Sequence, residues 1–122
     1  MSASILLTRF PVNQQSNAGL VFKQNMFAAV DVSRFDVLNL ELVLQQLSVS
    51  ATNLTVDILT GWDLSSEDIW YRAGSFGTFT TAPATALLRL TTGFQRLIRW
   101  QVTFGSSTGS CEFNIRGTGE TY

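Results

Sequence analysis

Residues 97–104 and 111–116 alternate between apolar and polar side chains with almost no break. Trp100 and Phe104 occupy apolar positions in the first stretch, and Phe113 does so in the second. Successive side chains of a β-strand point to opposite faces of a sheet, so this alternation is typical of half-buried strands. Because only a short link rich in Gly and Ser separates the two stretches, the sequence predicts that they form an antiparallel hairpin.

The same alternation runs through residues 37–50, where every second residue from Leu38 to Leu44 is Leu. A helix would instead place apolar residues at spacings of three and four, so a strand is favoured. A helix over residues 38–47 is kept as the alternative, because Leu, Glu and Gln are good helix formers. Residues 54–60 repeat the alternation and predict a further strand.

Short segments rich in apolar, β-branched or aromatic residues complete the predicted set of strands. These segments are residues 5–10, 20–30, 69–81 and 87–90. We expect the strand over 69–81 to bend at Gly74 or Gly77, since glycine weakens a strand interior. Turns or loops are expected at residues 32–36, 51–53 and 61–68. Residues 82–84 are expected to end the strand over 69–81, and residues 91–96 lead into the closing hairpin. Regularly spaced strands without a convincing helix predict an all-β fold, a single antiparallel two-sheet β-sandwich that is jelly-roll or galactose-binding-like.

The length of 122 residues suits one domain. We expect residues 20–122 to form the sandwich and residues 1–19 to form an N-terminal arm, because 11–19 are polar and show no periodicity. The apolar faces of the strands predict the core. Its expected members are Leu40, Leu42, Val56, Ile58, Trp70, Phe76, Leu88, Ile98, Trp100, Val102, Phe104, Phe113 and Ile115.

Composition argues against several kinds of function. The chain contains no histidine, which removes the usual general base and most transition-metal sites. Charged residues are sparse, the net charge is −1 and the basic residues are dispersed, so we expect no nucleic-acid binding. The single cysteine, Cys111, is expected as a small buried hydrophobe. Residues 1–10 carry no basic region and only a short apolar run, which predicts neither a signal peptide nor a membrane span.

The acidic residues do not form a recognisable catalytic or metal site. Glu41 and Asp57 lie on polar strand faces, whereas Asp63, Glu67 and Asp68 share one loop. No pattern indicates the burial that raises a carboxyl pKa for acid-base catalysis, and the loop lacks the spacing of an EF-hand. We therefore expect no catalytic residue, no metal ligand and no cofactor, with calcium binding by the loop kept as an alternative.

Aromatic residues concentrate in and after this loop. Trp70 and Phe76 are expected to fill the core. Trp62 and Tyr71 are expected at the surface, as a stacking platform for a sugar or an anchor for a protein partner.

Two further groups of side chains are candidate interface residues. Arg96 and Arg99 are expected to face outward and make polar contacts, because Arg99 points opposite to Trp100; solvated surface arginines are the alternative. The N-terminal segment carries a small apolar knot, expected to dock as an edge strand on its own sandwich or on a neighbouring subunit. This knot consists of Ile5, Leu6, Leu7 and Phe10.

The order of motifs between residues 37 and 119 resembles that of small β-sandwich structural proteins of tailed bacteriophages and prophages. The shared pattern is an alternating strand ending in Thr, a loop Asp, a Trp-Tyr pair, a Gly-Ser-Phe turn, a Leu-rich strand, an Arg-x-x-Arg-Trp strand and a final Phe-x-Ile-x-Gly. It corresponds here to residues 54–60, 63, 70–71, 74–76, 87–90, 96–100 and 113–117. The loop departs from the pattern, since it reads Asp-Leu-Ser-Ser-Glu-Asp where an Asp-Gly turn is common.

This resemblance implies a non-enzymatic virion protein, such as a head decoration, neck or accessory protein. It would be present in many copies and would contact itself and other virion proteins such as the major capsid protein. The alternative function is a carbohydrate-binding module that recognises surface glycans, and a glycoside-active enzyme is a more distant one. An exposed aromatic pair flanked by Asn, Gln or Asp would favour sugar binding, whereas a large, apolar, flat contact surface and an ordered N-terminal arm would favour assembly.

Overall fold

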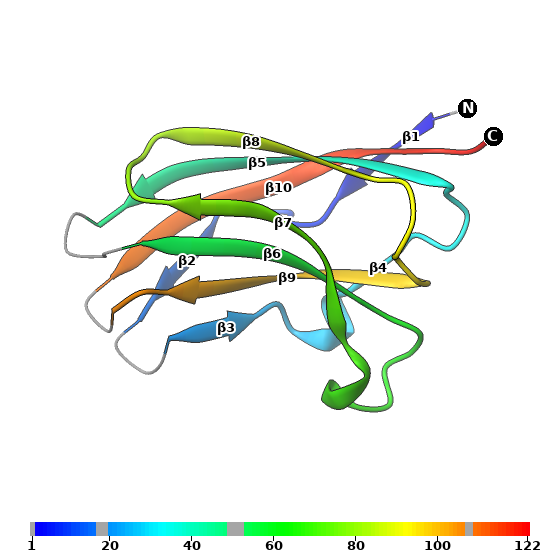
Figure 1. Ribbon diagram of the computed structural model, residues 1–122, viewed down its shortest axis with the longest axis horizontal. Coiled ribbons are helices and arrows are strands. Elements are labelled where there is room, and N and C mark those ends of the chain that lie inside the picture. The colour runs from blue at the N-terminus through cyan, green and yellow to red at the C-terminus, as the bar shows by residue number, and fades with distance from the viewer. Residues whose placement is uncertain (1, 17–19, 49–52, 107–108) are drawn as a thin grey trace.

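The computed structural model describes residues 2–16, 20–48, 53–106 and 109–122, and shows two antiparallel sheets packed face to face (Figure 1). The first sheet has the order β1-β10-β5-β8, with β2 also on β10, and the second has the order β3-β9-β6-β7, with β4 also on β9. The first sheet contains β1 (Ser2–Leu6), β2 (Val12–Gln15), β5 (Val37–Leu47), β8 (Ala84–Leu90) and β10 (Ser110–Glu120). The second contains β3 (Val21–Lys23), β4 (Val30–Asp31), β6 (Leu54–Gly61), β7 (Tyr71–Phe79) and β9 (Leu97–Phe104).

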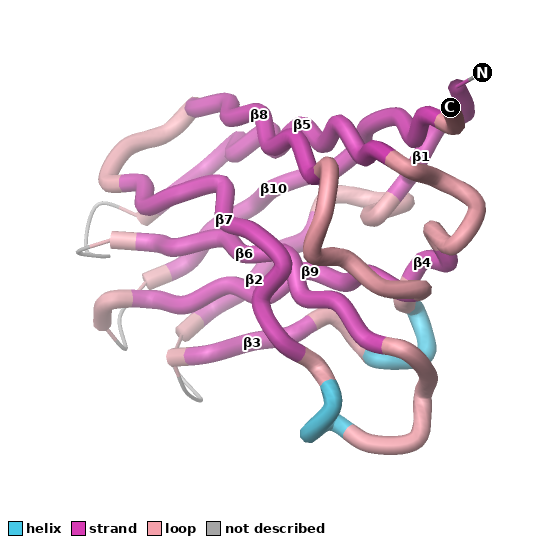
Figure 2. Tube along the Cα trace, turned by 45° about the vertical axis from the view of Figure 1, so that its right-hand side comes forward, coloured by secondary structure: helices cyan, strands magenta, loops and turns pink. Residues whose placement is uncertain are grey.

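The connections between the strands are those of a jelly roll. The chain passes from β5 to β6, from β7 to β8, and from β8 through β9 to β10 by changing sheet each time. Each layer is four strands wide, because β1 and β2 both pair with β10, and β3 and β4 both pair with β9. Two such layers joined by Greek-key crossings define a jelly roll. Figure 2 shows the two layers of strands, with short helical turns η1 (Met26–Ala28) and η2 (Glu67–Ile69) in the connections. The expected all-β sandwich is confirmed, and the helical alternative for residues 38–47 is wrong.

The hairpin predicted from residues 97–104 and 111–116 does not form. β9 pairs with β6 and β3 in the second sheet, whereas β10 pairs with β5 and β1 in the first. Apolar and polar side chains alternate along both strands because each strand has one face on the core. The period of two therefore predicts the two strands correctly. The periodicity carries no information about which strand lies beside which.

The core between the sheets contains most of the predicted residues. Leu88 is half-buried at its margin, and Trp70 lies outside it, in a separate cluster. Cys111 is buried as expected. The confirmed core residues are Leu40, Leu42, Val56, Ile58, Phe76, Ile98, Trp100, Val102, Phe104, Phe113 and Ile115.

The N-terminal quarter is more finely divided than expected. Where a polar loop or arm was expected over 11–19, Val12–Gln15 forms β2, because β10 offers a free edge that supplies its hydrogen bonds. The strand expected over 20–30 is split into β3, η1 and β4, since the Asn25 side chain accepts from the backbone N–H of Phe27 and starts a helical turn. Residues 1 and 17–19 of the expected arm, 49–50 of the strand expected over 37–50, 51–52 of an expected turn and 107–108 of the expected hairpin link lie outside the described residues.

Across the described ranges, no helix has both the length and the apolar character needed to cross a membrane.

Candidate functional site

The apolar knot near the N-terminus is divided between the core and the surface. β1 pairs antiparallel with β10 of the same chain, with Ile5 opposite Gly117. Ile5 and Leu7 are buried in the core, which corrects their assignment as interface residues: alternate side chains of a docked strand must face inward. Leu6 is 61% exposed and Phe10 is 78% exposed. The strand therefore docks on its own sandwich and leaves these two side chains at the surface.

A groove of about 660 Å³ opens beside this segment, at the edge where both sheets end. We call it the edge groove; it lies between the β1–β2 link and the β3–β4 link, and Trp100 of β9 also lines it. Its lining consists of Leu6, Leu7, Thr8, Arg9, Phe10, Pro11, Val12, Gln24, Phe27, Ala28, Ala29, Val30 and Trp100.

The amide of Gln24 holds the two walls of the edge groove together. Its Nε2 donates to the carbonyl of Leu7 at 2.9 Å and to that of Ala28 at 3.3 Å. Its Oε1 accepts from the backbone N–H of Trp100 at 3.2 Å. One side chain thus links the N-terminal segment, η1 and β9. These hydrogen bonds within the chain make the groove a preformed one.

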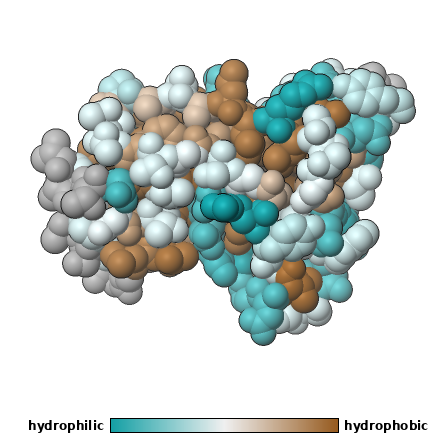
Figure 3. Space-filling model, viewed as in Figure 1, coloured by the Kyte–Doolittle hydropathy of each residue, from teal (hydrophilic) through white to brown (hydrophobic). Residues whose placement is uncertain are grey.

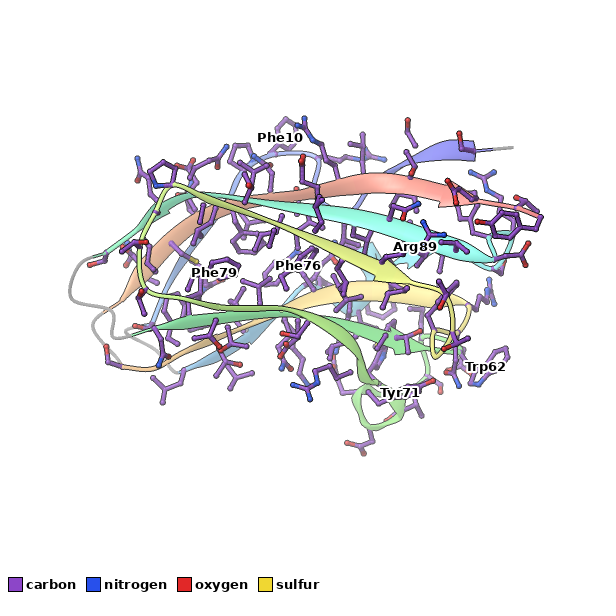
Figure 4. The ribbon with its side chains drawn as sticks, turned by 45° about the horizontal axis from the view of Figure 1, so that its top comes forward. Phe10, Trp62, Tyr71, Phe76, Phe79 and Arg89 are labelled. Atoms are coloured by element: carbon purple, nitrogen blue, oxygen red, sulfur yellow. The ribbon has the colours of Figure 1, made fainter. Side chains whose placement is uncertain are left out.

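Aromatic and aliphatic side chains project from the rim of the edge groove. Phe27 is 74% exposed and lines the groove together with Leu6 and Phe10; Figure 4 labels Phe10 where it points away from the sandwich. Leu20 and Val21, just before and at the start of β3, are also exposed. The sequence pattern assigned Phe27 to a strand, and no signal in it distinguished a rim residue from a core residue. Exposed apolar side chains gathered around a groove are typical of interaction sites on soluble proteins.

The β6–β7 connection forms a second exposed surface. Trp62 is 63% exposed and Tyr71 is 45% exposed, and Leu64 and Ile69 between them are also exposed. In Figure 2 this connection, with η2, projects beyond both sheets, and Figure 3 shows a hydrophobic patch surrounded by hydrophilic atoms in that projecting region. The structure therefore places the expected aromatic pair at the surface, at the two ends of one connection (Figure 4).

Arg99 fastens this connection to the outer face of β9 and is completely buried, which corrects its assignment as an exposed interface residue. It does point opposite to Trp100, but the β6–β7 connection folds over it. Its guanidinium pairs with the carboxylate of Glu67, donates to the carbonyl of Gln24 at 3.1 Å and lies 4.6 Å from the centre of the Trp70 ring. The hydrogen bond from Arg99 lowers the pKa of Glu67, so this carboxylate stays charged at neutral pH.

Trp70 belongs to this outer layer. It packs with Leu59 and Leu97, on the face of the second sheet that points away from the core. The expectation that Trp70 fills the main core is wrong, because the chain turns outward through η2 before β7 begins.

Arg96 is exposed as expected, but its partner belongs to the same chain. Its Nε lies 3.2 Å from Oδ2 of Asp31. Hydrogen bonds from the hydroxyl and backbone N–H of Ser33, together with that from Arg96, lower the pKa of Asp31 to about 2. Arg96 therefore fastens β4 to the end of β9 and has one carboxylate partner already.

The carboxylates do not converge. Glu41 pairs with Arg116 on the outer face of the first sheet, whereas Asp57 is buried on the outer face of the second. Asp63 accepts from the backbone N–H and hydroxyl of Ser65, which lowers its pKa and shapes a local turn. No group of three or more metal-ligating side chains occurs within the part of the chain that the structure describes.

No family model and no curated protein matches the chain. Several solved structures share its fold. The VP2 subviral particle of infectious bursal disease virus superposes with a TM-score of 0.54 and 12% identity, over 98% of this chain and 32% of VP2. The K1 cleaved adhesin domain of Lys-gingipain from Porphyromonas gingivalis W83 has a TM-score of 0.52 and 8% identity, over 100% of this chain and 99% of that domain.

A third similar structure is the endo-1,4-β-D-xylanase 10B of Clostridium thermocellum, with CBM22-1 and GH10 modules complexed with xylohexaose. It has a TM-score of 0.50 and 7% identity, over 98% of this chain and 26% of the enzyme. The chain thus spans about a third of VP2 and about a quarter of the xylanase chain. At these identities the likeness shows the fold alone.

Proposed function

We propose that this chain is a non-enzymatic structural protein of a tailed-phage virion, a head decoration, neck or accessory protein present in many copies. The observation that carries the proposal is the edge groove with its apolar rim, Leu6, Phe10 and Phe27. Covering exposed apolar surface with a partner is favourable by a free energy of about 25 cal/mol for each Å² that is buried. A rim that is both apolar and held in shape by Gln24 is therefore suited to permanent contact with another protein.

The fold is compatible with this role. VP2 of infectious bursal disease virus, which forms a subviral particle, contains a region that superposes on almost all of this chain. The motif order between residues 37 and 119, which resembles that of tailed-phage structural proteins, supports the same class of role, and the expected partners are further copies of the chain and the major capsid protein.

Quantitative mass spectrometry of gradient-purified phage particles tests the proposal. Cells carrying the gene should release particles that contain many copies of the chain. A variant with Phe10→Ser and Phe27→Ser should fold normally and be lost from the particles, because both changes fall on exposed residues of the rim. The control Leu87→Ser alters an equally exposed residue on β8, at the other edge of the first sheet, and should be incorporated normally. Particles without the chain, or normal incorporation of the double variant, would overturn the proposal.

The second candidate is a carbohydrate-binding module for surface glycans, and the exposure of Trp62 and Tyr71 favours it. Aromatic faces at the surface stack on the apolar faces of sugar rings. Titration with a panel of oligosaccharides, followed by tryptophan fluorescence, should then show saturable binding that Trp62→Ala abolishes and Phe27→Ala leaves intact. Absence of saturable binding across the panel would remove this candidate.

A further inference from the structure

The two exposed apolar surfaces have different shapes. The edge groove is hollow and is lined by the β1–β2 and β3–β4 links. The β6–β7 connection projects from the molecule and carries Trp62, Leu64 and Ile69 at its surface (Figure 2). Figure 4 places Phe10, on the rim of the groove, on the opposite side of the ribbon from Trp62 and Tyr71. One surface is thus a receptor and the other an insert, and the β3–β4 link lies between them, because Ala29 lines the groove and also packs against the cluster that contains Trp70.

Their charges are also opposite. Arg9 is exposed, is the one charged residue among the groove-lining side chains, and has no ion-pair partner within the described residues. The β6–β7 connection carries Asp63, Glu67 and Asp68, and no basic residue lies among them. Glu67 is neutralised by Arg99, whereas Asp68 is exposed and has no ion-pair partner in the described part of the chain. An unpaired cation in the groove therefore complements an unpaired anion on the connection.

We propose that copies of this chain join head to tail, with the β6–β7 connection of one copy seated in the edge groove of the next. In this arrangement Trp62 and Leu64 are covered by the apolar rim, and Asp68 approaches Arg9. The inference rests on the proposed function and specifies the partner of the edge groove. A joint between two different surfaces leaves one of each free at the ends, so copies add until a ring closes or a filament grows.

A mixing experiment distinguishes this joint from a symmetric one. The groove variant combines Phe10→Ser with Phe27→Ser, and the connection variant combines Trp62→Ser with Asp68→Lys. All four residues are exposed, and circular dichroism and thermal melting of each variant establish that it is folded. Sedimentation velocity should show concentration-dependent multimers larger than a dimer for the unaltered chain, and monomers for each variant alone. An equimolar mixture should give a discrete heterodimer, because only one joint in it is intact.

A charge exchange tests the pairing of Arg9 with Asp68. Arg9→Asp alone and Asp68→Arg alone should each weaken assembly, and the two changes in one chain should restore it. Raised salt should weaken assembly of the unaltered chain, since the pair is formed at an accessible rim.

Several results would overturn the head-to-tail joint. These are an unaltered chain that stays monomeric at its highest soluble concentration, a connection variant that assembles normally, or a mixture without heterodimer. Normal incorporation of the connection variant into phage particles, with loss of the groove variant, would overturn the joint and leave the virion assignment standing. If both variants are incorporated into particles normally, the result would instead count against the virion assignment itself.

Discussion

The indole of Trp100 on β9 meets the ring of Phe113 on β10 edge to face, with ring centres 5.2 Å apart and planes at 90°. The two residues lie on strands of different sheets, so the contact spans the core and holds the layers together. Phe113 is fully buried and Trp100 nearly so. The last two strands of the chain are therefore joined through their side chains and not through a shared ladder of hydrogen bonds.

Truncation of Trp100 should be the most costly single change in the core. Trp100→Ala is expected to lower the free energy of unfolding by about 3–5 kcal/mol, because it removes a large side chain and leaves a cavity. Chemical denaturation measures this loss. The matched control is Trp62→Ala, which should change stability by less than about 0.5 kcal/mol because Trp62 is 63% exposed. Equal effects of the two changes would contradict the placement of Trp100 in the core.

Replacement of Glu67 should destabilise the β6–β7 connection. Glu67→Gln leaves the buried guanidinium of Arg99 without its carboxylate, and we expect a loss of about 1–2 kcal/mol after allowance for the exposure of Glu67. Asp68→Asn, in the same turn but without an ion pair in the described part of the chain, is the control and should be nearly neutral. Hydrogen exchange should show faster opening of residues 61–70 in Glu67→Gln than in the control.

The same ion pair predicts a dependence of stability on pH. Arg99 lowers the pKa of Glu67 below its ordinary 4.5 in the folded chain. The unfolded chain therefore takes up this proton first as the pH falls, and the stabilisation present at neutral pH is lost below about 4.5. The difference in stability between the unaltered chain and Glu67→Gln should shrink over this acidic range. A difference that stays constant between pH 7 and pH 3 would contradict the ion pair.

Substitution of Gly117 should disrupt the first sheet. A Cβ placed there would lie 1.9 Å from the carbonyl oxygen of Asn39 on the neighbouring strand β5, so the backbones must move apart. Gly117→Ala is expected to cost about 3 kcal/mol, at the upper end of overpacking effects. Thr118→Ala, the next residue on β10 but exposed, serves as the control and should have little effect on the melting temperature.

Cys111 should resist thiol reagents in the folded chain. Burial raises the pKa of its thiol to about 12, and the thiolate is the reactive form. Labelling should be slow at pH 8 and become fast when denaturant unfolds the chain. Since the pKa is raised from 9.0, the unfolded chain releases this proton first and the contribution of Cys111 to stability falls as the pH rises from about 9 to 12. Rapid labelling of the folded chain would contradict its burial.

The sequence identified the long strands because each has one face on the core. Leu40 and Leu42 on β5, and Val56 and Ile58 on β6, are all buried as their alternation predicted. The missed strand β2 has the sequence Val-Asn-Gln-Gln and exists because β10 supplies a partner edge. A polar edge strand has no signature of its own, since its stability comes from hydrogen bonds to a segment distant in sequence.

The sequence predicted the candidate surfaces only in part. Alternation placed Arg99 opposite Trp100 correctly, but it could not reveal that Glu67 and Trp70 fold over that face. Similarly, the pairing of β1 with β10 decides that Ile5 faces inward. What a residue touches across the chain is set by topology, which periodicity does not encode.

The pairing of β1 with β10 has a consequence for how the chain reaches this structure. Ser2 lies opposite Glu120, and the two ends of the described chain meet at one corner (Figure 1). On a ribosome, β1 and β2 remain without their partner until residues 110–120 have emerged, so neither strand can be protected during synthesis. Such a dominance of distant pairings makes folding slow, in the range of milliseconds to seconds, and leaves unpaired strands open to other nascent chains. The segment that forms β10 therefore completes the sheet to which the earlier strands β1 and β2 belong.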